Sequence, residues 1–150
     1  MADTRIQLEV EDWVRRNWML SQYGMKFSRE RLRLRSGGIF DFDAVTEDRS
    51  IVAVISTSGA KTANGKHAVG KILKLRSDML FLTMVEAKRR IILLTEQDMC
   101  DLLKREFEGG RTPREIEFVC AEIPGDLRTK LIKAREKASG EFSRKAAGAS

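Results

Sequence analysis

Two rows of cationic side chains have the spacing to follow a phosphate backbone. One row lies in and after a glycine-containing loop at 59–66 and comprises Lys61, Lys66, Lys71 and Lys74. The other alternates along a strand-like segment and comprises Arg31, Arg33 and Arg35. Such rows bind nucleic-acid phosphates with little dependence on base sequence, and the affinity falls as salt rises. Because aromatic residues are absent from both rows, stacking on unpaired bases is not indicated. The alternative interpretation is ordinary solvated charge.

The loop at 59–67 has the context of a phosphate-binding loop but not its pattern. It follows an apolar segment and precedes a predicted helix. The pattern requires Gly-x4-Gly-Lys-Ser/Thr. Here five residues separate Gly59 from Gly65, and His67 replaces the hydroxyl residue that would bind magnesium. Nucleotide hydrolysis is therefore disfavoured, although backbone N–H groups at a helix start can still hold one phosphate.

The remaining chemistry-bearing residues support neither a triad nor a metal cluster. His67 is the one histidine, so a His-rich zinc site is excluded, and no Gly-x-Ser-x-Gly elbow accompanies it. Cys100 and Cys120 lack metal-ligand spacing and cannot make a disulfide framework. They fall in a predicted helix and a predicted strand, where we interpret them as small buried hydrophobic residues.

Composition favours one folded domain in a reducing cytoplasm. The chain has 150 residues, 42% of them hydrophobic, and only two prolines, which suits a domain at 1–138 followed by a flexible basic tail at 139–150. Its apolar runs are too short for a membrane span, and the acidic start is unlike a signal peptide. The net charge is +6, and residues 51–90, with eight basic and two acidic side chains, carry that much alone.

The hydrophobic periodicity predicts nine elements in the order α-β-β-β-α-β-α-β-α. A first helix with an apolar stripe from Ile6 to Val14 ends at Gly24. The strands are expected at 31–35, 39–45, 51–55, 91–94 and 115–123, and the later helices run from the loop to about 84, at 97–108 and at 126–138. Val69, Leu73 and Leu80 are among the apolar positions of the second helix. Short turns imply an antiparallel meander, and the later crossovers imply an α/β fold with a mixed sheet and flanking helices.

Three carboxylates occupy positions that need an explanation. Glu9 lies beside or within the apolar stripe of the first helix, where a carboxylate needs a partner or a solvent channel, whereas Glu11 is expected to point elsewhere. Asp41 and Asp43 share one face of the strand at 39–45. Taken separately, they are also compatible with a solvated strand face and a helix-surface carboxylate.

The order of elements and acids resembles that of the restriction-endonuclease-like, or PD-(D/E)xK, nuclease family. The resemblance covers roughly residues 5–95. It implies that Glu9 corresponds to the family's helix acid and Asp43 to its metal-binding aspartate, with Asp41 as a reinforcing ligand. The segment 37–45 is similar to the family's glycine-rich turn and acid-bearing strand.

The third motif of that family is missing. Where the family has Glu-x-Lys, this chain has Ser56, Thr57 and Ser58. Phosphodiester cleavage in such a site uses Mg²⁺ held by two or three carboxylates, together with a cation beside the attacking water. Lys61, or alternatively Lys66, is a candidate for a displaced cation, but the motif carboxylate has no replacement.

We therefore expect a nucleic-acid-binding protein of nuclease-like fold, with DNA favoured over RNA and a degenerate or weak active site. One alternative is an active metal-dependent DNA endonuclease, in which Asp43, Glu9 and Lys61 are catalytic and Mg²⁺ is the cofactor. Another is a non-enzymatic structural or oligomerisation domain, such as a homodimer formed through the last strand or the first helix. The sequence leaves open whether the chain is an enzyme.

Overall fold

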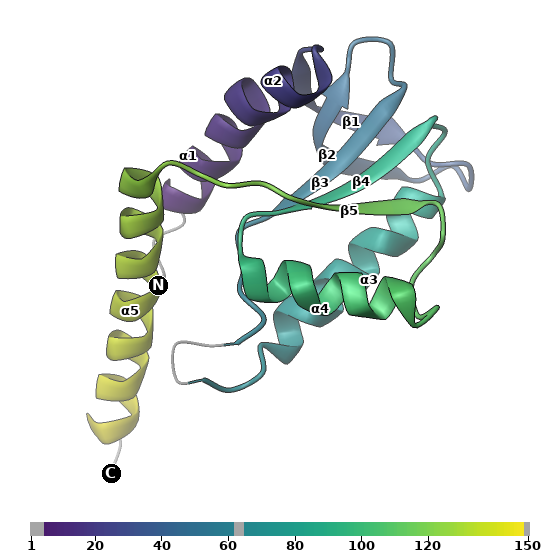
Figure 1. Cartoon of the computed structure of the whole chain (residues 1–150). Helices are drawn as coiled ribbons and strands as arrows, with labels where there is room; N and C mark the ends of the chain where they lie inside the picture. The colour runs from purple at the N-terminus through teal and green to yellow at the C-terminus, as the bar shows by residue number, and fades with distance from the viewer. Residues whose placement is uncertain (1–4, 62–64, 149–150) are drawn as a thin grey trace.

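Five strands form one mixed sheet in the order β1-β2-β3-β4-β5 (Figure 1). The computed structural model describes residues 5–61 and 65–148. The strands are β1 Phe27–Arg33, β2 Ile39–Thr46, β3 Ile51–Ser56, β4 Arg89–Leu94 and β5 Ile116–Cys120. The first three pair antiparallel, and β3, β4 and β5 pair parallel. The predicted meander, crossovers and α/β class are confirmed.

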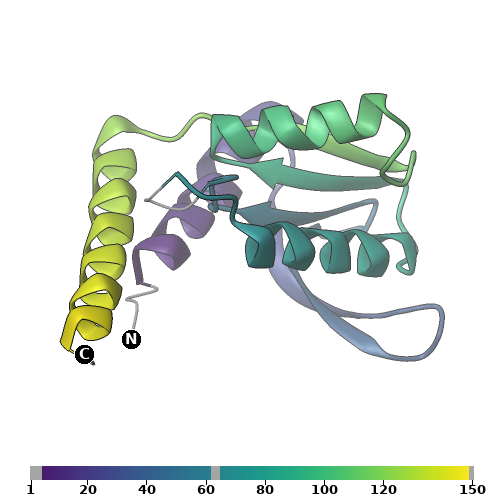
Figure 2. The same cartoon turned by 90° about the horizontal axis from the view of Figure 1, so that it is seen from below.

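Helices cover both faces of the sheet (Figures 1 and 2). Their bounds are α1 Arg5–Trp13, a π-helical stretch η1 Val14–Trp18, α2 Met19–Tyr23, α3 Val69–Thr83, α4 Gln97–Glu108 and α5 Gly125–Gly148. One core cluster joins α3 and α4 to the sheet, and a second joins α1, η1, α2 and the start of α5 to the opposite face. None of the described helices combines the length and apolarity that crossing a membrane would require.

The amphipathic pattern of the first helix is confirmed, but the helix is not uniform. Val10 and Val14 are fully buried, while Ile6 and Trp13 pack against the same cluster. The π-helical stretch interrupts the α-helix between Trp13 and Met19. As predicted, the helix ends at Gly24, whose φ of 66° lies in the left-handed region that glycine adopts without steric penalty.

The buried face of α3 differs from the apolar positions identified in the sequence. Val69, Leu73 and Leu80 are 59%, 59% and 58% exposed. The core positions are Leu75, Met79 and Leu82, together with the buried carboxylate Asp78. This helix has apolar residues on more than one side, so its periodicity alone does not select the side that packs on the sheet.

The carboxyl ends of the three parallel strands meet at one edge of the sheet. The register pairs Ser56 with Leu94 and Leu94 with Cys120. β3 is buried along its apolar run, as its unbroken hydrophobic sequence predicts. The segments that leave this edge are therefore neighbours, and they include residues 56–58, residues 95–96 and the start of the connection to α5.

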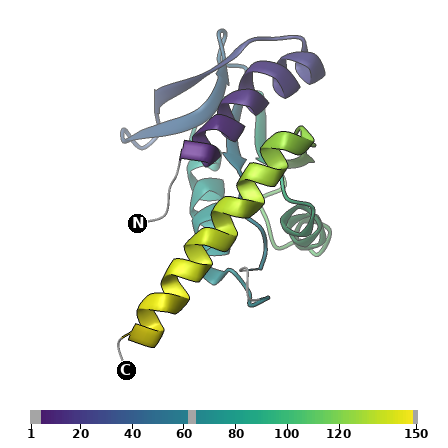
Figure 3. The ribbon, with the colours of Figure 1, turned by 90° about the vertical axis from the view of Figure 1, so that its left-hand side faces the viewer.

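Two features near the C-terminus depart from expectation. Helix α5 continues to Gly148 and extends past the body of the sheet, whereas its end was predicted at residue 138 (Figure 3). Alanine, lysine, arginine and glutamate in this stretch are good helix formers, which favours the continuation. Cys100 of α4 and Cys120 of β5 are joined by a disulfide, so describing them only as small hydrophobic residues was wrong.

Candidate carboxylate site

A β-bulge in β2 includes Asp43. The register pairs Ser28 with Val45 and Glu30 with Phe42, so the single residue Arg29 of β1 lies opposite both Asp43 and Ala44. Such a bulge bends the strand and turns two successive side chains toward the same side of the sheet. Ala44 belongs to the core cluster beneath α1, whereas Phe42 and Val45 belong to the cluster beneath α3. Alternation from Phe42 places Asp43 on the α1 side, and the bulge lets Ala44 share that side before Val45 returns to the α3 side.

Two hydrogen bonds hold Asp43 in place. The N–H of Ile55 donates to Oδ2 of Asp43 at 2.9 Å. Nε of Arg15, in the π-helical stretch, donates to the Asp43 carbonyl oxygen at 2.7 Å. Register pairs between β2 and β3 are formed at Ala44 and Val45, so Asp43 lies where these two strands part. Both contacts fix the aspartate at this opening.

The opening leads into a cavity of about 160 Å³ between α1, the end of β3 and α3. We call it the carboxylate cavity. Its lining residues are Gln7, Glu11, Ile55, Ser56, Thr57, Ser58, Lys71, Lys74, Leu75 and Asp78. Nζ of Lys74 forms an ion pair with Oδ2 of Asp78 at 3.2 Å, and the Asp78 side chain is only 6% exposed. The cavity thus combines two carboxylates, two amines and two serine hydroxyls.

Burial raises the pKa values of three carboxyl groups at this site, and the charge of Asp43 adds to the effect on Glu11 and Asp78. Burial, followed by the charge of Asp43, raises the pKa of Glu11 to about 7. Burial also raises the pKa of Asp43, against the opposing effects of the Ile55 N–H and nearby cations. The pKa of Asp78 is raised mainly by burial, with Lys74 acting in the opposite direction. Excess negative charge is therefore disfavoured here, and an added cation or a proton would relieve it.

The donor set is thinner than a three-carboxylate nuclease site. Among residues 5–61 and 65–148, no group of three or more His, Cys, Asp or Glu side chains is arranged to hold a metal ion. Mg²⁺ in phosphoryl-transfer sites is commonly bound by one or two carboxylates together with water and substrate phosphate oxygens. Glu11 and Asp43, whose charges interact, are the two carboxylates that would be available for this limited role.

Glu9 does not lie at this cavity. Its carboxylate is exposed and pairs with Nζ of Lys130 on α5 at 3.7 Å. Glu11, which was expected to point elsewhere, lines the cavity instead. The apolar stripe locates the buried side of α1, but it does not show which flank of that side faces the opening between β2 and β3. The sequence therefore assigned Glu9 to the site and Glu11 away from it, and the structure has the opposite arrangement.

Asp41 and Lys61 are also placed outside the cavity lining. Nη2 of Arg29 forms an ion pair with Asp41 at 3.0 Å, and Nε donates a second hydrogen bond at 3.2 Å. Lys61 is exposed, and its backbone forms an isolated bridge with His67. The amine that pairs with a site carboxylate is that of Lys74, and Asp78 joins Glu11 as a cavity carboxylate that the sequence did not indicate. An acid among the core positions of a helix was the available signal for Asp78.

Each of the two cationic rows has one member that already forms an ion pair. Lys66, Lys71, Arg31 and Arg33 are exposed, and none of them forms an ion pair within the part of the chain that the structure describes. Arg35 pairs with Glu86 at 2.7 Å, and Lys74 with Asp78. Lys71 and Lys74 are the members that line the carboxylate cavity. Cations available for external phosphates therefore lie on α3, on the loop before it and on β1.

Comparison of the chain with protein-family models, with curated proteins and with solved structures returned no match. Its function is accordingly inferred from the chemistry of the carboxylate cavity and of the cations around it.

Proposed function

We propose that the chain is a cytoplasmic nucleic-acid-binding protein of restriction-endonuclease-like fold, which prefers DNA to RNA and carries a degenerate nuclease site. The observation that supports this most directly is the carboxylate cavity itself. It lies where β2 and β3 part, next to a bulged aspartate and a helix glutamate, and cationic side chains border it. The order of helices and strands in residues 5–94 agrees with the element order on which the resemblance to this family rests.

The substitution of Glu-x-Lys by serines favours binding over cleavage. Ser56 and Ser58 line the cavity at the positions of the missing motif. Their hydroxyls can donate hydrogen bonds to phosphate oxygens, whereas a carboxylate there would repel them. Lys71 and Lys74 add positive charge from α3. With a pKa of about 7, Glu11 is partly neutral at physiological pH, which lowers its repulsion of a phosphate.

Binding of duplex DNA over a salt series tests the proposal. Each neutralised phosphate contributes a slope of about −0.9 in a plot of log affinity against log salt. We expect the double variants Lys66→Ala/Lys71→Ala and Arg31→Ala/Arg33→Ala each to lose one or two phosphate contacts. The slope should become shallower by the contribution of those contacts. Lys104→Ala on α4, which also removes an exposed cation, is the matched control and should leave the slope unchanged.

Two results would contradict this function. One is the absence of binding at about 50 mM salt, a condition that strengthens phosphate contacts, and it would favour a structural or oligomerisation role instead. The other is an equal loss of affinity in the Lys104→Ala control, because that would show a response to net charge alone. Single-stranded DNA and duplex RNA, tested in parallel, check the preference for duplex DNA.

A second candidate function is Mg²⁺-dependent phosphodiester cleavage, which the ion pair between Lys74 and Asp78 favours. This pair brings an amine and a further carboxylate into the cavity from α3, where the sequence motif lacks both. A bound Mg²⁺ would be held by Glu11 and Asp43 and would supply stabilisation of the developing phosphate charge. Lys74 would hold the scissile phosphate beside these carboxylates, and Ser56 would orient it by donating a hydrogen bond.

Cleavage and metal binding are measured separately with the same variants. If the chain cleaves DNA, Asp43→Ala and Lys74→Ala should abolish cleavage, and Asp43→Ala should also weaken Mg²⁺ binding measured calorimetrically without DNA. Asp41→Ala and Lys61→Ala should retain both, because Asp41 pairs with Arg29 and Lys61 is exposed. Asp43, by contrast, is hydrogen-bonded to Ile55 of the cavity lining and interacts with Glu11. Cleavage that persists in Asp43→Ala, or that is lost in Lys61→Ala, would contradict this assignment.

A further inference from the structure

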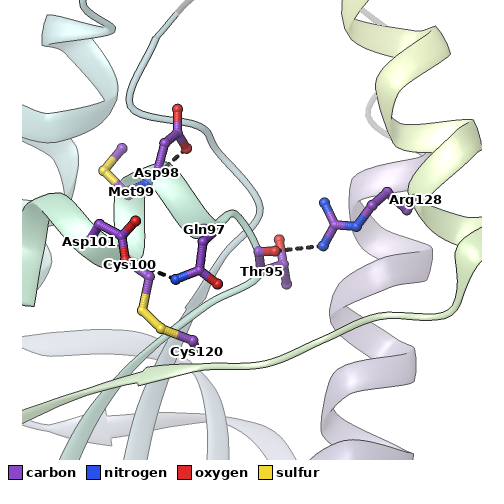
Figure 4. The surroundings of a disulfide bond; sticks show 8 residues. All are labelled: Thr95, Gln97, Asp98, Met99, Cys100, Asp101, Cys120 and Arg128. Atoms are coloured by element: carbon purple, nitrogen blue, oxygen red, sulfur yellow. Dashed lines mark hydrogen bonds between the residues drawn. A yellow bond between two sulfur atoms is a disulfide. The ribbon is translucent and has the colours of Figure 1, made fainter.

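The disulfide between Cys100 and Cys120 joins two residues of unequal exposure. It joins the first turn of α4 to the last residue of β5, across a Cα–Cα distance of 6.0 Å (Figure 4). Cys100 is fully buried in the core cluster beneath α4. Cys120 is only partly buried. A reagent that approaches from solvent therefore meets Cys120 first.

Cys120 also lines a second cavity, of about 400 Å³, at the edge where the parallel strands end. Its other lining residues are Leu94, Thr95, Gln97, Ala121, Glu122 and Arg128, and Cys100 is not among them. Arg128 reaches this edge from α5, where it donates to the Thr95 carbonyl oxygen at 2.7 Å (Figure 4). The cavity gives a small molecule access to one side of the disulfide.

We propose that Cys120 is a thiol–disulfide exchange site for low-molecular-weight thiols, with Cys100 as the resolving cysteine. The incoming thiolate forms a bond to Sγ of Cys120 while the bond between the two protein sulfurs breaks, and the electron pair leaves on Sγ of Cys100. A second thiolate then attacks the small-molecule sulfur of the mixed disulfide on Cys120. A small-molecule disulfide departs, and Cys120 is left reduced. Two electrons pass from two thiols to the protein disulfide.

The reverse direction uses the same asymmetry. A small-molecule disulfide entering the cavity transfers one sulfur to reduced Cys120 and releases its other half as a thiol. Cys100, held within disulfide distance by α4, then attacks Cys120 and expels the remaining thiol. In a reducing cytoplasm a disulfide is usually transient or redox-sensing rather than permanent, and an accessible sulfur beside a buried one has the arrangement for that role.

Trapping experiments on the whole chain test which sulfur reacts. The native disulfide is first identified by non-reducing peptide mapping. The folded protein is then treated with glutathione, quenched in acid, alkylated and mapped again. The expected intermediate has glutathione on Cys120 and an alkylated Cys100. Glutathione found equally on both residues, or on Cys100 alone, would overturn the proposal, as would a native protein whose two thiols remain free after equilibration with oxidised glutathione.

Two single variants show how the exposure of each cysteine affects its reaction with oxidised glutathione. Cys100→Ser leaves Cys120 without its resolving partner, so oxidised glutathione should form a stable mixed disulfide with it. Cys120→Ser leaves the buried Cys100, which should react at least about tenfold more slowly, because thiol reactivity follows exposure. Circular dichroism establishes that each variant is folded, and the wild-type trapping stands even if one is not. Equal rates in two folded variants would contradict the proposed role of the cavity.

Discussion

Asp43 connects three elements through two hydrogen bonds. Its side chain accepts from the backbone of β3 and its carbonyl oxygen accepts from Arg15 in η1, while the bulge in β2 provides the geometry for both. The aspartate is therefore a structural residue as well as a candidate ligand. Its structural role can be tested without any substrate.

The hydrogen bond from Ile55 predicts a difference between two substitutions of Asp43. Asp43→Asn retains an acceptor oxygen for the Ile55 N–H, whereas Asp43→Ala leaves this partly buried donor without a partner. An unsatisfied buried donor costs about 1–3 kcal/mol, so Asp43→Ala should be less stable than Asp43→Asn by that amount. Both variants remove the charge, and comparing them by urea unfolding isolates the hydrogen bond. Equal stabilities would show that it contributes nothing.

The raised pKa of Glu11 predicts a pH dependence of stability. Between about pH 4.5, the ordinary pKa of glutamate, and about pH 7, the Glu11 carboxyl is protonated in the folded protein but ionised in the unfolded chain. Stability must therefore fall as pH rises through this window. Glu11→Gln removes the effect and should raise the Tm at pH 8 by roughly 2–4 °C, a value that allows for partial solvation of the carboxyl, with little change near pH 4.5.

Glu9→Gln is the matched control for that pH experiment. Glu9 lies on the same helix, but its carboxylate is exposed beside Lys130. Its substitution should shift the Tm equally little at both pH values, because an exposed ion pair contributes at most about 1 kcal/mol. A pH-independent Tm difference for Glu11→Gln would contradict the burial of that carboxyl.

In addition to its apolar contacts, helix α5 forms two ion pairs with one buried carboxylate. Glu96, the residue directly before α4, accepts from Nη1 of Arg128 at 2.9 Å and from Nη1 of Arg135 at 2.7 Å. Arg135 also donates to the carbonyl oxygen of Thr57, a residue that lines the carboxylate cavity. The position of α5 is thus linked to the segment that replaces the nuclease motif.

Removing Glu96 should loosen α5 more than removing the exposed ion pair between Glu9 and Lys130 does. The Glu96 side chain is 7% exposed and its two arginine partners are 33% and 32% exposed. Glu96→Ala is expected to cost about 2–4 kcal/mol, somewhat less than a fully buried pair because the arginines can regain water. Tryptic cleavage within α5 should become faster than in the control Glu9→Ala. Equal cleavage rates in the two variants would argue against Glu96 as the anchor.

At the scale of the whole molecule, the disulfide closes the edge where the parallel strands end. Cys100 and Cys120 are 20 residues apart in sequence, and their bond ties α4 to β5. A crosslink that closes a loop of this size stabilises a fold by about 3 kcal/mol, mainly through the unfolded state. The bond therefore couples the redox state of the protein to its overall stability.

Reduction should lower the thermal stability of the wild-type chain. The stabilisation of about 3 kcal/mol corresponds to a fall in Tm of roughly 6–12 °C for a domain of this size. The Tm is measured with and without reductant, and Cys120→Ser, which has no disulfide to lose, is the control. A reductant effect of the same size in that variant would rule out the disulfide as its cause.

The fold determines which of the cations in residues 51–90 are exposed to solvent. Residues 51–90 carry the entire net excess of +6 in their sequence. The structure divides these residues: Lys66 and Lys71 are exposed, whereas Arg90 is part-buried and donates to the carbonyl oxygens of Leu82 and Val85. Only part of the cationic excess predicted to bind phosphate is therefore available for an external partner.

The sequence alone determined the elements that depend on local pattern. The unbroken apolar run at 51–55 is a buried strand, the helix at 97–108 ends before Gly109 as predicted, and Gly24 ends the first helical segment. These outcomes follow from short-range physics, namely side-chain periodicity and the backbone freedom of glycine. The mixed sheet then follows from short turns and crossovers.

Tertiary structure alone decided which residues share the site. The parting of β2 and β3 beyond Ala44 opened the position of Asp43, and helix packing selected Glu11 over Glu9. Folding also buried Asp78 beside Lys74 and joined Cys100 to Cys120. Each of these outcomes depends on the relative rotation and position of elements distant in sequence. Local periodicity sets a buried face only within a broad arc, and a shift of one residue in a strand reverses the direction of a side chain.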